Sequence, residues 1–274
     1  MSRLSREIHE QPEVLARMLD EQAGRAAELA NVIRERNVCY AVLAARGTSD
    51  NAARYAQYLF GSLNGLPVAL ATPSLFTIYQ TPPRLRQALV LGISQSGQSP
   101  DIVAVVEEGR RQGALTAAVT NTPDSPLGDA AEHVLALEAG DEKAVAATKT
   151  YTAQLGALAL VAAHLADDEE RLAELTRVPA AVEKTLALEE TIAAAAQRYA
   201  HAGECVVLGR GYNYATAFEI ALKLKELTYI VAEPYSSADF RHGPVALVER
   251  GFPVIAIAPH GAVYGDMVAL IEEL

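Results

Sequence analysis

The chain has 274 residues, 50% of them hydrophobic and 21% charged, and its 23 Lys and Arg against 34 Asp and Glu give a formal charge of −11. This apolar content excludes a disordered chain, and the length suffices for one large domain or for two lobes. The acidic balance argues against nucleic acid or an anionic membrane as the main partner, because both are bound through clustered Lys and Arg.

The start of the chain and its two cysteines bear on the compartment. No apolar run of the kind found in a signal peptide follows the charged N-terminal residues, and the longest apolar stretch, 155–166, is too short to cross a bilayer. Cys39 and Cys205 lie in apolar runs, so we expect both to be buried, reduced side chains. The sequence therefore predicts a soluble cytoplasmic protein without a metal or other cofactor.

The expected elements begin with a helix over 13–35, where apolar residues recur every three or four positions. Short apolar runs then alternate with helical stretches. The predicted strands are 38–44, 67–71, 88–94, 115–120 and 134–137, and the helices between them are 50–63 and 99–112. Uninterrupted apolar strands separated by helices predict an α/β fold with a parallel sheet covered on both faces.

A helical block follows, with helices expected over 148–166, 168–176 and 179–200 and a break at Val178-Pro179. A second unit of strand, turn and helix opens at Cys205.

The chain repeats itself at an offset of 164 residues. Arg46-Gly47 recurs as Arg210-Gly211, Gly97 corresponds to Gly261, and the strand over 89–93 corresponds to 253–257. We interpret the chain as two copies of one flavodoxin- or Rossmann-like unit. The last strands of the first copy have no counterpart before residue 274, so the second lobe is expected to be incomplete at its C-terminal side.

These patterns predict four regions. They are a leading helix over 1–36, a first lobe over 37–165, a helical connector over 166–201 and the front portion of a second lobe over 202–274.

The segment Ser94-Gln95-Ser96-Gly97-Gln98-Ser99 joins a buried strand to a helix. Backbone N–H groups at a helix start attract anions, and hydroxyls add donors around phosphate oxygens. The ordinary interpretation is a helix cap made by Ser96 or Ser99, but one hydroxyl would satisfy a cap. Three hydroxyls and a carboxamide favour a phosphate site.

Two familiar motifs fail here. A nucleophile elbow requires Gly where this chain has Ser96, and a dinucleotide fingerprint over 209–214 requires Gly where it has Tyr214.

Two other segments are candidate parts of a site. Thr48 and Ser49 follow a strand of the same lobe, so this turn could face the serine-rich loop, although it could also be an ordinary helix cap. Glu219, Lys223 and Glu226 share one helix face, either as a solvated ion-pair ladder or as catalytic groups. His242 lies in a polar loop, and a carboxylate with an imidazole is a pair suited to proton transfer at neutral pH.

Together these residues resemble the sugar isomerase (SIS) domain family, specifically the isomerase half of glutamine–fructose-6-phosphate aminotransferase or a stand-alone relative resembling glucosamine-6-phosphate deaminase. The segments that carry the resemblance span nearly the whole chain. They are Arg46-Gly47-Thr48-Ser49, Ser94-Gln95-Ser96-Gly97-Gln98-Ser99, Val145-Ala146-Ala147-Thr148-Lys149, Ala221-Leu222-Lys223-Leu224-Lys225-Glu226 and Arg241-His242-Gly243-Pro244.

The resemblance implies a role for each matching residue. Ser94, Gln95, Ser96 and Ser99 would hold a 6-phosphate. Thr48, Ser49 and the backbone near Val145 would contact the sugar. Glu226 would move a proton between C1 and C2, His242 would assist ring opening and Lys223 would stabilise developing charge. The family's histidine comes from a neighbouring subunit, which implies a homodimer.

The chain also departs from the family. No glutaminase segment precedes the isomerase motifs, so glutamine-driven amination is not expected, and Ala147 stands where the family usually has Ser. The leading hypothesis is a phosphosugar isomerase or deaminase acting on glucosamine 6-phosphate or fructose 6-phosphate. The alternatives are a deglycase on another phosphosugar amine and a non-catalytic sugar-phosphate sensor.

Overall fold

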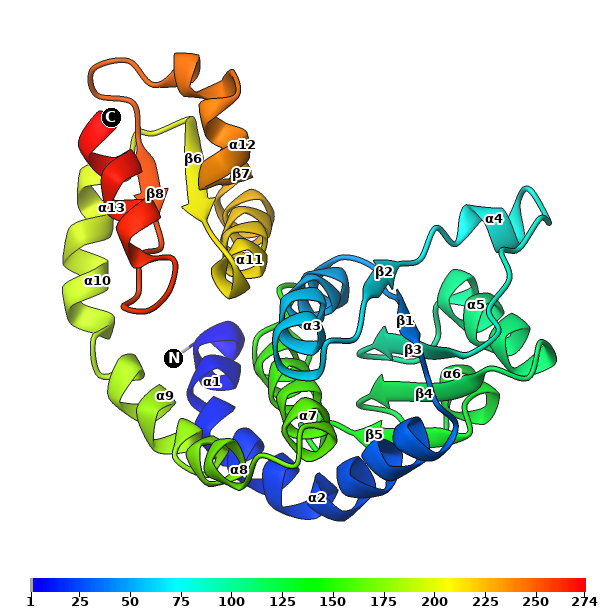
Figure 1. Cartoon of the computed structure of the whole chain (residues 1–274). Coiled ribbons are helices and arrows are strands. Elements are labelled where there is room, and N and C mark those ends of the chain that lie inside the picture. Colours follow the sequence, from blue (N-terminus) through cyan, green and yellow to red (C-terminus); the bar gives the residue numbers. More distant parts are fainter. Residues whose placement is uncertain (1) are drawn as a thin grey trace. The chain divides into compact units, whose positions relative to one another are not determined.

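The computed structural model describes residues 2–274 and divides the chain into two compact units, Met1–Leu186 and Ala187–Leu274 (Figure 1). The dividing point lies within the segment expected to be a helical connector. Each unit is built on its own parallel sheet, of five strands in the first unit and three in the second. The predicted α/β class with two parallel-sheet lobes is thereby confirmed.

The first sheet has the strand order β2-β1-β3-β4-β5. All seven predicted strands and helices of this lobe are present, and three short helices, α1, α4 and α6, were not predicted. The elements of the first unit are α1 (Arg3–His9), α2 (Gln11–Glu35), β1 (Tyr40–Ala44), α3 (Thr48–Asn64), β2 (Val68–Leu70), α4 (Ser74–Thr77), β3 (Ala88–Ser94), α5 (Pro100–Arg111), β4 (Leu115–Thr120), α6 (Pro126–Ala130), β5 (His133–Ala136), α7 (Lys149–Leu165), α8 (Glu169–Leu175) and α9 (Val178–Leu186).

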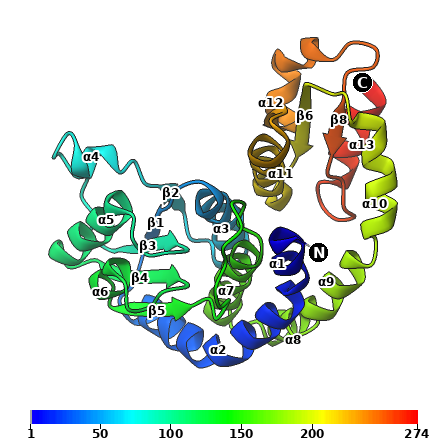
Figure 2. The ribbon, with the colours of Figure 1, turned by 180° about the vertical axis from the view of Figure 1, so that it is seen from behind.

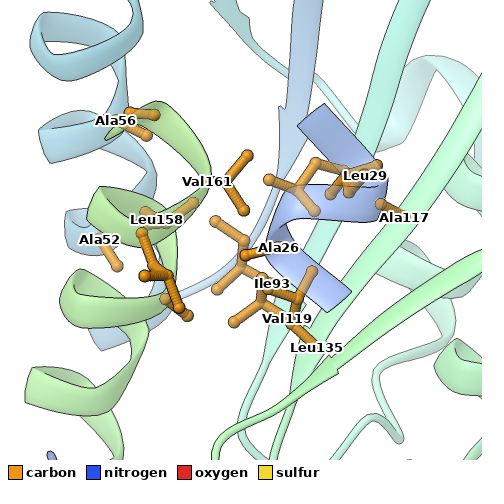
Figure 3. Packing of buried hydrophobic residues seen from close by; sticks show 14 of the residues in the cluster. Ala26, Leu29, Ala52, Ala56, Ile93, Ala117, Val119, Leu135, Leu158 and Val161 are labelled. Carbon is orange, nitrogen blue, oxygen red and sulfur yellow. The ribbon is translucent and has the colours of Figure 1, made fainter. Parts of the chain in front are cut away.

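Helices cover both faces of this sheet, as the unbroken apolar strands predicted. On one face α2, α3 and α7 pack against alternate strand residues such as Ile93 and Val119, and Figure 3 shows Leu158 and Val161 of α7 in this layer. On the other face α5 and α6 pack against the intervening residues. Figure 2 shows the two helical layers from behind. The central strands are therefore buried, and their polar groups gather where the strands end.

The second sheet has the order β7-β6-β8, and helices again flank it. The helix α11 packs on one face, while α12 and α13 pack on the other through Phe240, Met267 and Leu270. The elements of the second unit are α10 (Glu189–Ala196), the 3-10 helix η1 (Gln197–Tyr199), β6 (Glu204–Gly209), α11 (Tyr212–Thr228), β7 (Val231–Ser236), α12 (Ser237–Arg241), the 3-10 helix η2 (Pro244–Leu247), β8 (Val254–Ala256) and α13 (Tyr264–Glu273).

The 164-residue repeat is a repeat of backbone geometry. The order β7-β6-β8 reproduces β2-β1-β3, and the N-cap glycines of α3 and α11 have nearly the same conformation, with φ 55° and ψ −131° at Gly47 and φ 59° and ψ −130° at Gly211. The C-caps also coincide at this offset, since Gly65 has φ 61° and ψ 18° and Tyr229 has φ 61° and ψ 14°. The two units thus have the same strand order and the same backbone conformation at these helix ends, although their sequences differ.

Two expectations were wrong. Cys205 is buried as predicted, but Cys39 is exposed because β1 begins only at Tyr40, and Cys39 belongs to the connection that precedes the strand. The helix expected over 179–200 is interrupted after Leu186, where the chain passes from one compact unit to the other. Within residues 2–274, none of the helices has the length and apolar character needed to cross a membrane.

Candidate functional site

A pocket of about 230 Å³ lies at the carboxyl ends of β1 and β3 in the first unit. These strands are neighbours in the parallel sheet, so the loops that follow them emerge side by side, as sheets of this kind arrange their ligand sites. The start of α7 forms a third wall. The pocket is lined by Arg46, Thr48, Ser49, Ser94, Gln95, Ser96, Ala147, Thr150 and Gln154.

The loop after β3 is folded by its own serines. The hydroxyl of Ser94 accepts a hydrogen bond from the Gly97 N–H at 3.1 Å, and the Ser96 hydroxyl accepts one from the Gln98 N–H at 3.3 Å. The Gln95 carbonyl accepts from the Asn121 N–H at 3.1 Å. Each hydroxyl that accepts one bond in this way retains its own O–H for donation, so the loop offers donors to an anion.

Gly97 is the residue that allows the loop to turn so tightly. Its φ is +65°, and a Cβ there would come within 1.9 Å of the Ser125 hydroxyl oxygen. Only glycine fits both the left-handed backbone and this close approach.

Ser99 occupies the N-cap position of α5, but its side chain makes no capping hydrogen bond. Ser99 therefore lies at the cap position that the ordinary interpretation of this loop expected. Its hydroxyl, however, does not accept a hydrogen bond from an N–H group at the start of the helix. Ser99 itself is not among the residues that line the pocket.

Arg46 supplies the positive charge at the rim. Its guanidinium lies 2.9 Å from the Asp101 carboxylate in the first turn of α5, which ties the loop after β1 to the helix after β3. Because both side chains are about half exposed, this pair is worth little for stability, and its effect is to hold the two loops together.

The segment of Val145 and Ala147 was expected at the sugar, and Ala147 lines the third wall, but Thr150 and Gln154 were missed. Thr150 and Gln154, which lie four residues apart and so on the same face of α7, are both fully buried. Gln154 donates from Nε2 to the Ser49 hydroxyl at 2.9 Å. The available signal was the presence of two polar residues at helical spacing in an otherwise apolar helix.

Carboxylates fasten the loop that leads into α7. Glu142 accepts from the N–H groups of Thr148 and Thr150 at 2.8 and 3.3 Å and from both threonine hydroxyls, the one of Thr150 in a very short contact. Glu7 of α1 accepts from the N–H of Lys143 at 2.7 Å. The N-terminal helix therefore holds the segment that carries Val145 and Ala147.

The buried ammonium of Lys149 completes this attachment. Its Nζ lies 2.5 Å from Glu10 Oε2, and its side chain is only 4% exposed. A lysine so buried needs its counter-charge, so Glu10 is the partner that permits the position.

In the second unit, the charged face of α11 is not a solvated ladder. Lys223 Nζ lies 3.3 Å from Glu219 Oε1 and 2.7 Å from Glu226 Oε2, so one ammonium bridges two carboxylates. The Glu219 side chain is 8% exposed and that of Lys223 is 21% exposed, whereas Lys225 is exposed. Partial removal from water strengthens these charge interactions relative to surface pairs.

His242 follows α12 and is exposed. The preceding residue, Arg241, is held by Asp266 at 3.1 Å and by Glu273 at 3.0 Å, both on α13. Asp266 also accepts a short hydrogen bond from the Ser237 hydroxyl, which with Arg241 lowers the pKa of its carboxyl. The helix that precedes His242, α12, is thus held at both ends by residues of α13.

Five of the seven predicted ligand-contacting residues, Thr48, Ser49, Ser94, Gln95 and Ser96, line one pocket. Ser99 and Val145 do not line it, and the Val145 side chain is exposed. Glu226 and Lys223 are paired on α11 in the second unit. No group of three or more His, Cys, Asp or Glu side chains within residues 2–274 is arranged to hold a metal ion.

The comparisons with known proteins agree along the chain. The SIS domain description matches residues 37–164 and 198–274. A glutamine–fructose-6-phosphate aminotransferase from Gloeobacter violaceus is 37% identical over 98% of this chain and 46% of its own length. The corresponding enzyme from Thermus thermophilus is 36% identical, with the same coverage. The chain thus spans about half the length of these curated relatives.

Solved structures share the fold over the whole chain. A candidate phosphosugar isomerase from Silicibacter pomeroyi is 38% identical with a TM-score of 0.90, and the match covers 100% of this chain and 83% of that one. The C-terminal domain of glucosamine–fructose-6-phosphate aminotransferase from Francisella tularensis is 27% identical with a TM-score of 0.89, covering 100% and 80%.

Proposed function

The chain belongs to the SIS domain family, and on that basis we propose that it is an enzyme that binds a hexose 6-phosphate in the pocket of the first unit and interconverts its aldose and ketose forms. The observation that carries the proposal is the pocket itself, in which Ser94, Gln95 and Ser96 face Thr48 and Ser49. Hydroxyl and backbone donors at a helix start are suited to a phosphate group. The relatives named above act on fructose 6-phosphate, which has such a group.

In this proposal the phosphate binds at the loop over 94–99, where Ser99 adds its side chain or backbone N–H at the start of α5. The sugar extends toward Thr48, Ser49 and the segment of Val145 and Ala147. This orientation is favoured by charge, because Glu142 is bonded at the start of α7 and would repel a phosphate there.

Glu226 is assigned the proton transfer. Its carboxylate would remove the proton from C2 of the open-chain aldose and return it at C1, through an enediol intermediate. Lys223, which lies 2.7 Å from Glu226, would stabilise the negative charge that develops on the sugar oxygen. His242 would assist ring opening, and we place it in the site of a neighbouring subunit in a homodimer.

Two substrate classes fit this chemistry. An aldose–ketose pair such as glucose 6-phosphate and fructose 6-phosphate needs only the proton transfer. Glucosamine 6-phosphate would release ammonia as well, because the C2 amine leaves once the ketose imine is hydrolysed. A sensor that binds the phosphosugar without turnover would need the loop over 94–99 but not the paired charges of α11.

The test is to incubate the purified chain with glucosamine 6-phosphate, and separately with fructose 6-phosphate with and without ammonia, while both sugars and ammonia are followed. Turnover that is lost in Glu226→Gln is the expected result. Tight phosphosugar binding without turnover would replace the enzyme with the sensor, and turnover that survives Glu226→Gln would remove the role given to this carboxylate.

A further inference from the structure

Gln154 is a buried amide at the pocket with one of its two polar atoms unused. The residue is 1% exposed and lines the pocket. Its Nε2 donates to Ser49 Oγ at 2.9 Å, while its Oε1 has no hydrogen-bond partner among residues 2–274. A buried carbonyl oxygen left unpaired costs about 1–3 kcal/mol, so it requires an explanation in a native structure.

The neighbouring polar group on α7 shows the contrast. Thr150, one turn earlier on the same face, is satisfied on both its N–H and its hydroxyl by Glu142. Among the side chains that line this pocket, the buried oxygen without a partner is therefore that of Gln154, which adjoins Ser49 of the opposite wall.

The bond to Ser49 has a consequence of its own. Ser49 is only 8% exposed, and its oxygen accepts from Gln154, which leaves the Ser49 O–H to donate. Gln154 thus orients one donor of the pocket and itself provides one acceptor beside it.

We propose that Gln154 is a specificity-determining residue that recognises the polyol part of the bound phosphosugar. Its Oε1 accepts a hydrogen bond from a hydroxyl or amino group of the ligand, while its Nε2 holds Ser49 in place to donate. The inference rests on the proposed function, since it assumes a phosphosugar in this pocket.

The phosphate is excluded as the partner of Gln154 by charge. A carboxamide oxygen repels phosphate oxygens, and the Glu142 carboxylate at the start of the same helix adds to this repulsion. A hydroxyl or ammonium donor suits the same position. A site built to pair such a donor rejects a ligand that lacks it, because the acceptor is then left unpaired.

The experiment measures binding by calorimetry to a hexitol 6-phosphate, which has the hydroxyls of the sugar but no carbonyl to react, and to inorganic phosphate. Gln154→Leu is expected to weaken hexitol phosphate binding about 5- to 30-fold and to leave phosphate binding within about twofold. The matched control is Gln57→Leu on α3, which removes a hydrogen bond to Val68 outside the pocket and should change neither affinity.

A series of hexitol 6-phosphates, each lacking one hydroxyl, identifies the group that Gln154 recognises. One member should bind the unmodified protein as weakly as the full ligand binds Gln154→Leu, and it should lose nothing further in that variant. Gln154→Met, with similar length and no oxygen acceptor, repeats the measurement should the leucine variant fail to fold.

The outcomes separate the two proposals. Unchanged hexitol phosphate binding in the variants, or an equal loss of hexitol phosphate and phosphate, would overturn the role of Gln154 and leave the proposed function standing. Failure of the unmodified protein to bind either ligand would overturn the proposed function, and this inference with it.

Discussion

The two units of the molecule are copies of one backbone plan that carry different chemistry at equivalent positions. In the first unit β3 ends at Ser94 and its loop begins with Gln95 and Ser96, and at an offset of 164 residues the second unit has Ala258, Pro259 and His260. At this loop, the hydroxyl donors that suit an anion occur in the first copy alone. The repeated strand order therefore says little about which copy binds a ligand.

The helices α3 and α11 show the converse difference. Leu59 of α3 is buried in the apolar core, and its counterpart on α11 is Lys223, which bridges two carboxylates. The counterparts of Glu219 and Glu226 in the first copy are Tyr55 and Ser62. The comparison teaches that glycines and strand spacing preserve the scaffold, while individual side chains at loop ends and on helix faces give the first copy a loop of hydroxyl donors and the second copy a cluster of paired charges.

The largest expected effect lies in the second copy. Glu226→Gln keeps the shape of the side chain but cannot accept a proton, so we expect turnover to fall about 100- to 10,000-fold. Hexitol 6-phosphate affinity should stay within about twofold if the first copy binds the phosphate. The control is Ser62→Ala at the equivalent position of α3, which should leave turnover unchanged; an equal loss in both variants would contradict the division of roles.

Next in size is the contrast between two equivalent glycines. Gly97→Ala forces a left-handed residue into the Ser125 side chain, and we expect a loss of about 3 kcal/mol in the free energy of unfolding and of at least about tenfold in phosphate affinity. Gly261→Ala is also strained at φ +137°, but a Cβ there meets nothing within 4 Å. Gly261→Ala should lower the free energy of unfolding, measured by chemical denaturation, by about 1 kcal/mol and leave phosphate affinity unchanged.

A smaller effect separates two ion-paired lysines, buried Lys149 and partly exposed Lys223. Glu10→Gln removes the carboxylate that is ion-paired with Lys149 and should destabilise the first unit by about 2 kcal/mol, less than for a fully buried pair because Glu10 is partly exposed. Glu219→Gln leaves Lys223 ion-paired with Glu226 and should lower the free energy of unfolding by about 1 kcal/mol. Urea denaturation compares the two variants. A greater loss in Glu219→Gln would show that Glu219 supports more than the charge of Lys223.

A still smaller effect on the free energy of unfolding is expected at the C-cap residues of α3 and α11, Gly65 and Tyr229. Tyr229 has φ 61° and is 88% exposed, whereas Gly65 has the same conformation at no steric cost. We expect Tyr229→Gly to stabilise the second unit by about 0.5–1 kcal/mol and Gly65→Ala to destabilise the first by a similar amount. Thermal and urea unfolding measure both. A destabilised Tyr229→Gly variant would mean that the tyrosine ring makes a contact worth more than the strain.

The smallest effect is on acid stability. Burial lowers the pKa of His164 below its ordinary value of 6.5, so the unfolded chain binds a proton more readily than the folded one. The contribution of His164 to stability should therefore decline as the pH falls from 6.5 to the lowered folded pKa and change no further below it. His164→Gln should flatten this decline in urea titrations at several pH values, and the exposed His201→Gln should not. The same slope in both variants would assign it to other groups.

Much of this architecture could be predicted from the sequence. Unbroken apolar strands and helical spacing give a local signal, so the five strands of the first sheet and the 164-residue repeat were recognised. The loop over 94–99 was recognised because its polar residues are adjacent in the chain. The exposure of Cys39 was not recognised, because an apolar run does not reveal at which residue the strand begins.

The third wall of the pocket depends on the tertiary structure. Gln154 and Ser49 are 105 residues apart in the chain, and Lys149 and Glu10 are 139 apart, so no local pattern relates them. They meet because α7 and α3 pack on the same face of the sheet and because α1 reaches the loop before α7. Local sequence thus determined the elements and the polar loop over 94–99. Long-range packing decided which polar groups are buried beside that loop, since burial follows from neighbours that only the folded chain brings together.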